Sequence, residues 1–213
     1  MTAPRVGGVT GVILCGGAGR RMGGTDKPLT LLHDKPMVLH VRERLAPQVD
    51  RVLISANANA AAYAQWGDAV IADEWAERAA PGHAAERDHR GGPLFGIRAA
   101  LRVVRQQSNN ALLFCCPGDA PRLSPTLVSR LYDALDTSSA AAYPHDGEQA
   151  QVLFVLLRAS AETVQSLDDY LRRGERSVHG WLSTMHTVQV NARDVADCFV
   201  NINTAQELIE ASA

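Results

Sequence analysis

The chain has 213 residues, 46% of them hydrophobic, and a formal net charge of −2; this length suits one large domain or two small ones, with a core that needs no disulfides. The small net charge argues against a nucleic-acid-binding protein, and no apolar run approaches the roughly 18 residues needed to cross a membrane. Because residues 1–8 also lack the apolar core of a signal peptide, we expect a soluble cytoplasmic protein.

The first elements alternate between strand and helix. Apolar runs predict strands at 9–15, 51–55 and 69–72, and helices are predicted at 37–46 and in the alanine-rich stretch 59–66. This alternation indicates a parallel sheet covered by helices. The predicted fold is therefore α/β, with three layers: a mostly parallel central sheet and helices on both faces. In such sheets ligands bind beyond the carboxyl ends of the strands.

The first predicted strand leads into a glycine-rich loop, which reads Leu14-Cys15-Gly16-Gly17-Ala18-Gly19-Arg20-Arg21-Met22-Gly23-Gly24-Thr25-Asp26-Lys27. Its glycines allow the backbone to turn N–H groups toward an anion. The side chains of Arg20, Arg21 and Lys27 add positive charge at the same place. We therefore predict a diphosphate or triphosphate site; the alternative is a solvated glycine turn with ordinary surface cations.

Polar side chains also follow the other predicted strands. Ser55 and Asn57 lie at the end of the second strand, Asp73 closes the third, and Asp119 follows the buried strand 111–115. A carboxylate that faces a phosphate loop could hold Mg²⁺. Each of these residues could instead be a helix cap or a turn former, but their convergence on one edge of the sheet favours a binding site.

The second half of the chain continues the pattern with less regularity. Ser124 and Pro125 are predicted to open a helix that runs to 135, with Ser124 as its cap. A strand is predicted over 199–203, in which Asn201 and Asn203 would face the same side as possible ligand contacts. The remaining predictions are helices at 95–104, 159–172, 178–182 and 204–211, strands at 140–143, 152–157 and 188–190, a surface loop at 74–90 and a charge cluster at 172–176.

The four cysteines, Cys15, Cys115, Cys116 and Cys198, show no metal-ligand spacing. Adjacent Cys115 and Cys116 would point to opposite faces of a strand. We predict that all four are small buried hydrophobic residues in a reducing compartment.

The loop pattern Leu14-Cys15-Gly16-Gly17-x-x-x-Arg21-Met22-Gly23-x-x-Lys27 resembles the signature of the nucleotidylyltransferases. Further segments resemble the molybdenum cofactor guanylyltransferases, the MobA family, and occur in the same order: 70–73, 92–96, 114–121 and 199–204. The resemblance covers nearly the whole chain. It implies a Rossmann-like nucleotidyltransferase fold in one domain, 1–213, with an N-terminal half that binds GTP and a C-terminal half that binds molybdopterin.

The resemblance also implies a reaction, in which GMP passes from Mg·GTP to the molybdenum–molybdopterin cofactor and pyrophosphate is released. By family analogy, Lys27 would bind the phosphates, Asp119 would bind Mg²⁺, and Ser55 and Asp73 would face the guanosine; Ser55 stands where the family would have asparagine, whereas Asn57 matches. The implied contacts with nucleotide or cofactor are Leu14, Cys15, Gly16, Gly17, Lys27, Ser55, Asn57, Asp73, Asp119, Asn201 and Asn203. Proteins that deliver the cofactor, and molybdoenzymes that receive it, would be possible partners.

This reaction requires little covalent chemistry from the side chains of the protein. The terminal phosphate of the cofactor would attack the α-phosphorus in line, so positioning and charge neutralisation suffice. Arg21 and Lys27 would offset charge on the transition state and on the leaving group, and Arg21, Lys27 and Asp119 are the predicted catalytic residues.

Two alternative functions remain open at this point: another nucleotidylyltransferase, such as a cytidylyl or sugar-phosphate enzyme, and a non-catalytic carrier of GTP or pterin. A dinucleotide-binding dehydrogenase fails on spacing, because its fingerprint requires an acid at the end of the second strand, where this chain has Ser55 and Asn57.

Overall fold

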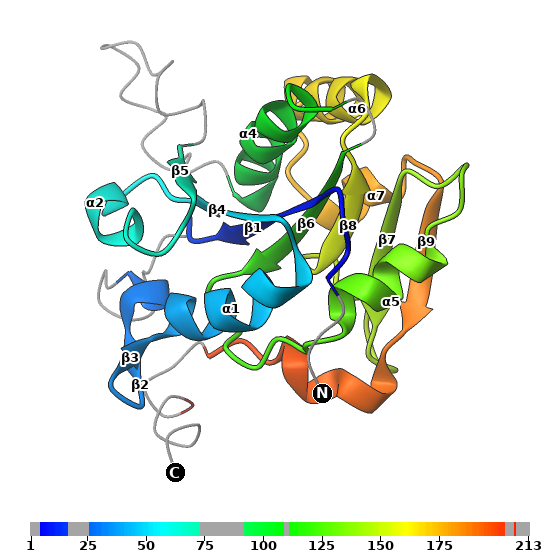
Figure 1. Cartoon of the computed structure of the whole chain (residues 1–213). Helices are drawn as coiled ribbons and strands as arrows, with labels where there is room; N and C mark the ends of the chain where they lie inside the picture. The colour runs from blue at the N-terminus through cyan, green and yellow to red at the C-terminus, as the bar shows by residue number, and fades with distance from the viewer. Residues whose placement is uncertain (1–4, 17–25, 73–91, 109–110, 203–206, 208–213) are drawn as a thin grey trace, which may run out of the picture.

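The computed structural model describes residues 5–16, 26–72, 92–108, 111–202 and 207. Its central sheet has seven strands (Figure 1), which are β1 (Val9–Leu14), β4 (Arg51–Ser55), β5 (Ala69–Ile71), β6 (Leu112–Pro117), β7 (Ala141–His145), β8 (Val155–Arg158) and β9 (Thr187–Asn191). They lie side by side in the order β5-β4-β1-β6-β8-β7-β9. A short hairpin of β2 (Leu31–Leu32) and β3 (Lys35–Pro36) forms a second, separate sheet.

Strand β1 lies between two parallel neighbours. Leu14, its last residue, is in register with Ser55 on β4 and with Pro117 on β6. The chain leaves β1 toward β4 and β5 on one side and later returns to β6 on the other side. The crevice beyond the carboxyl ends of β1 and β6 is therefore a topological switch point, where open α/β sheets bind their ligands. Only β8 among these strands runs antiparallel to its neighbours, β6 and β7.

Helices cover both faces of the sheet (Figure 1). Helices α1 (Met37–Leu45), α2 (Ala60–Tyr63) and α5 (Leu127–Ala134) pack on one face, and α4 (Pro93–Arg105), α6 (Ala161–Arg172) and α7 (Val178–Leu182) pack on the other. Each face has its own hydrophobic core. Strand β6 is buried throughout, and its Cys115 and Cys116 enter opposite cores. The predicted three-layer α/β fold is thus confirmed, as is the prediction of four buried, free cysteines.

Helix α5 begins later than the sequence suggests. Ser124 is the predicted cap and Pro125 the predicted first helical residue, but the helix begins at Leu127, after a turn in which the Leu127 N–H donates to the Ser124 carbonyl. The cap comes from a distant segment: the buried Gln48 side chain accepts a hydrogen bond from the Val128 N–H at 3.1 Å. Gln48 belongs to the 3₁₀ helix η3 (Ala46–Gln48), so a tertiary contact supplies what a local cap would otherwise provide.

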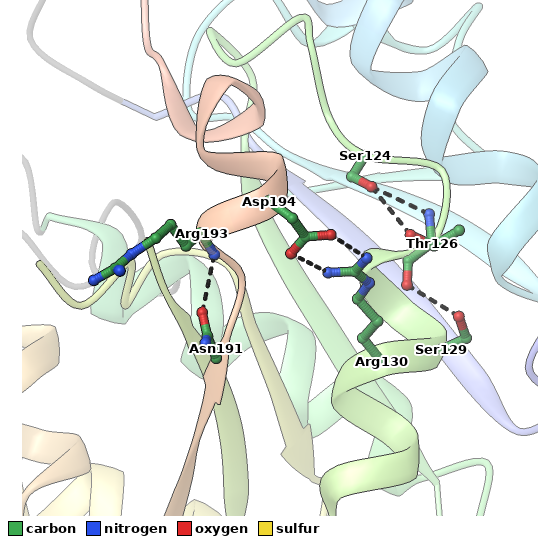
Figure 2. Close-up of polar contacts among 7 residues, drawn as sticks. All are labelled: Ser124, Thr126, Ser129, Arg130, Asn191, Arg193 and Asp194. Atoms are coloured by element: carbon green, nitrogen blue, oxygen red, sulfur yellow. Dashed lines mark hydrogen bonds and ion pairs between the residues drawn. The ribbon is translucent and has the colours of Figure 1, made fainter. Parts of the chain in front are cut away.

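The prediction of a strand over 199–203 is wrong within the described residues. The chain forms the 3₁₀ helix η5 (Arg193–Phe199) and then continues without a strand through 200–202. Its Asp194 carboxylate accepts two hydrogen bonds from the guanidinium of Arg130 on α5 (Figure 2), one of them at 2.8 Å. Phe199 meanwhile packs edge to face on Phe154, with ring centroids 5.0 Å apart. These contacts favour a compact turn over an extended edge strand.

No helix in the described part of the chain is long and apolar enough to cross a membrane. The predicted loop at 74–90 lies outside the described residues, and so does the predicted closing helix at 204–211 apart from Glu207, which is helical.

Candidate active site

The candidate site begins where β1 ends. The Cys15 N–H donates to the Ser55 carbonyl at 2.8 Å, and the Leu14 carbonyl accepts from the Gly118 N–H at 3.0 Å. These two hydrogen bonds extend the sheet by one step on each side of β1. Gly16, the next residue, is exposed at the crevice. The backbone thus leaves the sheet at the switch point, as a nucleotide-binding loop requires.

Asp119 lies in the turn that directly follows β6. A Cβ added to Gly118 would lie 2.8 Å from Cys15 Sγ and 3.1 Å from Pro28 Cβ. Glycine at this position therefore lets the Lys27-Pro28 segment pack directly on the turn that carries Asp119. Lys27 opens the short 3₁₀ helix η2 (Lys27–Leu29), with Pro28 in its first turn. The structure brings together Lys27 and Asp119, which are far apart in the sequence.

The electrostatics of Asp119 reflect this arrangement. Burial raises the pKa of its carboxyl group, and the ammonium group of Lys27 partly offsets that rise. A half-buried carboxylate next to a cation at the mouth of the switch point can accept a metal ion or a hydrogen bond from a ligand.

The C-terminal segment closes the far side of the site. The Ile202 N–H donates to the Asp119 carbonyl at 3.0 Å, and Ile202 packs with Leu32 and Met37 in a small third hydrophobic cluster. Asn201, the preceding residue, is consequently held near Asp119 in a segment that is not a strand, and its contact with a ligand stays a prediction. The hydrogen-bonded ion pair between Asp194 of η5 and Arg130 of α5 (Figure 2) fixes the start of this segment.

Asn57 and Ser55, the predicted nucleotide contacts at the end of the second strand, differ in their surroundings. Asn57 is exposed, and a Cβ on Gly16 would lie 4.0 Å from its side-chain nitrogen. Ser55 is only 5% exposed, and a Cβ on Gly96 of α4 would lie 2.5 Å from its hydroxyl oxygen. Ser55 therefore serves the close packing of α4 against β4, and its contact with a guanosine remains a prediction.

Four predicted site residues lie outside the described residues, so their roles also remain predictions: Gly17, Arg21, Asp73 and Asn203.

Sequence reasoning missed a polar cluster behind Lys27. The Asp26 carboxylate accepts hydrogen bonds from Tyr63 Oη at 2.7 Å and from Asn59 Nδ2 at 2.8 Å. Tyr63 and Asn59 belong to the segment that was predicted only as an alanine-rich helix. The available signal was a lone tyrosine in that segment together with the Asp26-Lys27 pair, but no spacing rule connects residues that are 37 positions apart.

The charge cluster at 172–176 reaches the start of α4. The Arg176 guanidinium carbon lies 5.3 Å from the centroid of the Phe95 ring, in a cation–π contact. Gly96, one residue further along α4, packs against Ser55 and Leu14. Arg176 therefore contributes positive charge at the same edge of the sheet as the rest of the site.

The donor set fits a magnesium ion that is shared with a phosphate ligand. Among the described residues, no group of three or more potential metal-ligating side chains occurs, so these residues form no cage that would hold a metal ion with protein ligands alone. Mg²⁺ is typically held by one or two carboxylates together with substrate phosphates and waters. Asp119, half-buried in the turn that follows β6, matches that mode.

The fold and the site together are those of a nucleotidyltransferase: a mostly parallel sheet, a glycine-rich sequence that begins where β1 ends at the switch point, and Lys27 close to Asp119. Comparison with known proteins agrees. Residues 11–188 match the family described as the MobA-like NTP transferase domain, and the chain belongs to this family. It is an enzyme of the nucleotidyltransferase class.

Curated relatives cover almost the whole chain. The chain is 41% identical to a molybdenum cofactor guanylyltransferase of Burkholderia orbicola, over 98% of this chain and 97% of the relative. It is 36% identical to one of Shewanella putrefaciens, over 93% of each chain. The fold matches the crystal structure of molybdopterin-guanine dinucleotide biosynthesis protein A from Archaeoglobus fulgidus, with a TM-score of 0.72, 20% identity, and 95% and 96% of the two chains covered.

Proposed function

We propose that the protein transfers GMP from Mg·GTP to the molybdenum–molybdopterin cofactor, producing the guanine dinucleotide cofactor and pyrophosphate. The observation that carries this proposal is the packing of Lys27-Pro28 on the Asp119 turn at the switch point. The names of the relatives support the choice of guanine and of the molybdenum cofactor, because the relatives are molybdenum cofactor guanylyltransferases.

In this proposal, an oxygen of the cofactor's terminal phosphate attacks the α-phosphorus of GTP. A new P–O bond forms, the bond between the α-phosphorus and its bridging oxygen breaks, and pyrophosphate leaves with that electron pair. Lys27, together with Arg21, neutralises charge that grows on the phosphoryl oxygens, while Gly16 and Gly17 give the phosphates access to backbone N–H groups. Because no protein nucleophile is needed, the buried cysteines have no chemical role.

Asp119 is the proposed ligand of Mg²⁺. A bound magnesium ion would supply Lewis-acid polarisation of the phosphoryl oxygens. Burial favours this role, because a half-buried carboxylate gains more from a cation than a solvated one does. Asp119 thereby links the metal, the Lys27 segment and, through its carbonyl, the C-terminal segment.

The two halves of the chain would divide the substrates within one domain. The N-terminal half would hold the guanosine near Asn57, Ser55 and Asp73. The C-terminal half would hold the molybdopterin near Asn201 and Asn203, with Arg176 at the start of α4 as a further contact for its phosphate. Proteins that deliver the cofactor or receive the product would be partners in the cytoplasm, a reducing compartment that suits four free thiols.

A pyrophosphate-release assay tests the proposal. The four nucleoside triphosphates are presented in turn with Mg²⁺, each with and without the molybdenum–molybdopterin cofactor. We expect pyrophosphate only with GTP and only when the cofactor is present. Release with CTP or ATP would identify another nucleotidyltransferase, and release from GTP without the cofactor would indicate a hydrolase.

A further inference from the structure

The hydroxyl of Tyr63 contacts the chain directly before Lys27. It donates to Asp26 Oδ1 at 2.7 Å. Asp26 immediately precedes Lys27, so a side chain from α2 holds the main chain at the residue before the lysine.

The tyrosine is itself firmly placed. It is fully buried, at 0% exposure, and its ring packs edge to face on Trp66 with centroids 6.3 Å apart. Burial raises the pKa of the Tyr63 hydroxyl above its usual value, so the group stays protonated and able to donate. Asn59 completes the contact by donating to the other oxygen of Asp26 at 2.8 Å. Hydrogen bonds to a carboxylate are shorter and stronger than those between neutral groups.

Asp26 in turn fixes the segment that carries Lys27. Its carbonyl accepts from the Leu29 N–H at 2.9 Å, which closes η2. Pro28 on the same turn packs against Gly118, next to Asp119. A carboxylate held by two donors therefore sets the position of the main chain from which the Lys27 side chain extends.

We propose that Tyr63 and Asn59 are positioning residues for Lys27, acting through Asp26 on the guanylyl transfer described above. This inference rests on the proposed function. Correct placement of a charged group lowers the barrier to phosphoryl transfer without adding a contact to the substrate. The effect should therefore fall on kcat rather than on the KM for GTP, because charge contacts of this kind strengthen as the transition state forms.

Tyr63→Phe is the main test, since it removes the hydroxyl and keeps the ring on Trp66. We expect kcat to fall about tenfold to hundredfold, the range that a displaced catalytic group produces, with little change in the KM for GTP. Asn59→Ala, at an exposed position, should give a smaller fall in kcat. Tyr170→Phe is the matched control, because Tyr170 is buried in the core on the opposite face of the sheet; it should leave kcat unchanged.

A double-mutant cycle separates positioning from mere structural support. In a Lys27→Ala background, Tyr63→Phe should have almost no further effect on kcat, because the group that it positions is gone. An equal fold-loss in both backgrounds, or an unchanged kcat in Tyr63→Phe, would overturn the inference while wild-type transfer still stands. Failure of the wild-type chain to transfer GMP would overturn the proposed function and this inference with it.

Discussion

The contact between Gly118 and the two neighbouring segments can be tested by adding one methyl group. In Gly118→Ala the new Cβ would lie 2.8 Å from Cys15 Sγ and 3.1 Å from Pro28 Cβ and Cγ. Overpacking of this kind costs about 1–3 kcal/mol, and the lower chain entropy of alanine in the unfolded state returns about 0.4–1 kcal/mol. From the middle of each range the net loss should be about 1.3 kcal/mol, which lowers Tm by about 3–5 °C for a chain of this length.

The assay is thermal unfolding followed by circular dichroism, with guanylyl transfer measured in parallel. Gly7→Ala is the control, because a Cβ there meets no atom within 4 Å. In a Cys15→Ala background the nearest obstructing atom is absent, so the penalty of Gly118→Ala should shrink. If Gly118→Ala melts at the temperature of Gly7→Ala, the reasoning about this contact is refuted.

Four further predictions concern the charged residues of the site and the accessibility of the cysteine thiols. Lys27→Ala should lower guanylyl transfer by about 150-fold, or about 3 kcal/mol, with the melting temperature largely kept; near-normal turnover would remove Lys27 from the mechanism. Because ionised Asp119 is required and its pKa is raised by burial, transfer should fall as pH drops through that pKa; Lys27→Ala removes the compensating cation, so this acid limb should move to higher pH. Arg176→Ala should raise the KM for the molybdenum cofactor and leave that for GTP unchanged; equal effects on both would place Arg176 elsewhere. Burial raises the pKa of the Cys198 thiol to about 11, so iodoacetamide at pH 8 should alkylate the cysteines only after unfolding; mass spectrometry of the native protein provides the check.

The sequence predicts the local pattern of this fold well, because strands and amphipathic helices have their own periods. The buried run of β6 and the approach of β1 to its glycine loop are visible as short apolar stretches followed by breakers. The start of α5 was misplaced because its cap is Gln48, a residue 80 positions away from Val128. No local rule reports a cap supplied by tertiary structure.

The candidate site shows the same limit. Lys27 and Asp119 can be proposed from their places after strands, since parallel strands bring their carboxyl ends to one edge. The hydrogen bonds of Tyr63 and Asn59 to Asp26 depend on how α2 lies beside the segment that precedes η2, and composition does not reveal that arrangement. Ser55 shows a packing constraint that its place at a strand end does not reveal: the close approach of Gly96 accounts for a small side chain there, and the ligand contact of Ser55 stays a prediction.

The most direct test of the proposed reaction follows the phosphorus atoms of GTP. The protein is incubated with Mg²⁺, the molybdenum–molybdopterin cofactor and GTP labelled at either the α- or the γ-phosphorus. The account predicts that α-label enters the cofactor in equal amount to the pyrophosphate released, and that γ-label appears only in pyrophosphate. Label from α-labelled CTP entering the cofactor as readily, or γ-label appearing as free phosphate, would contradict it.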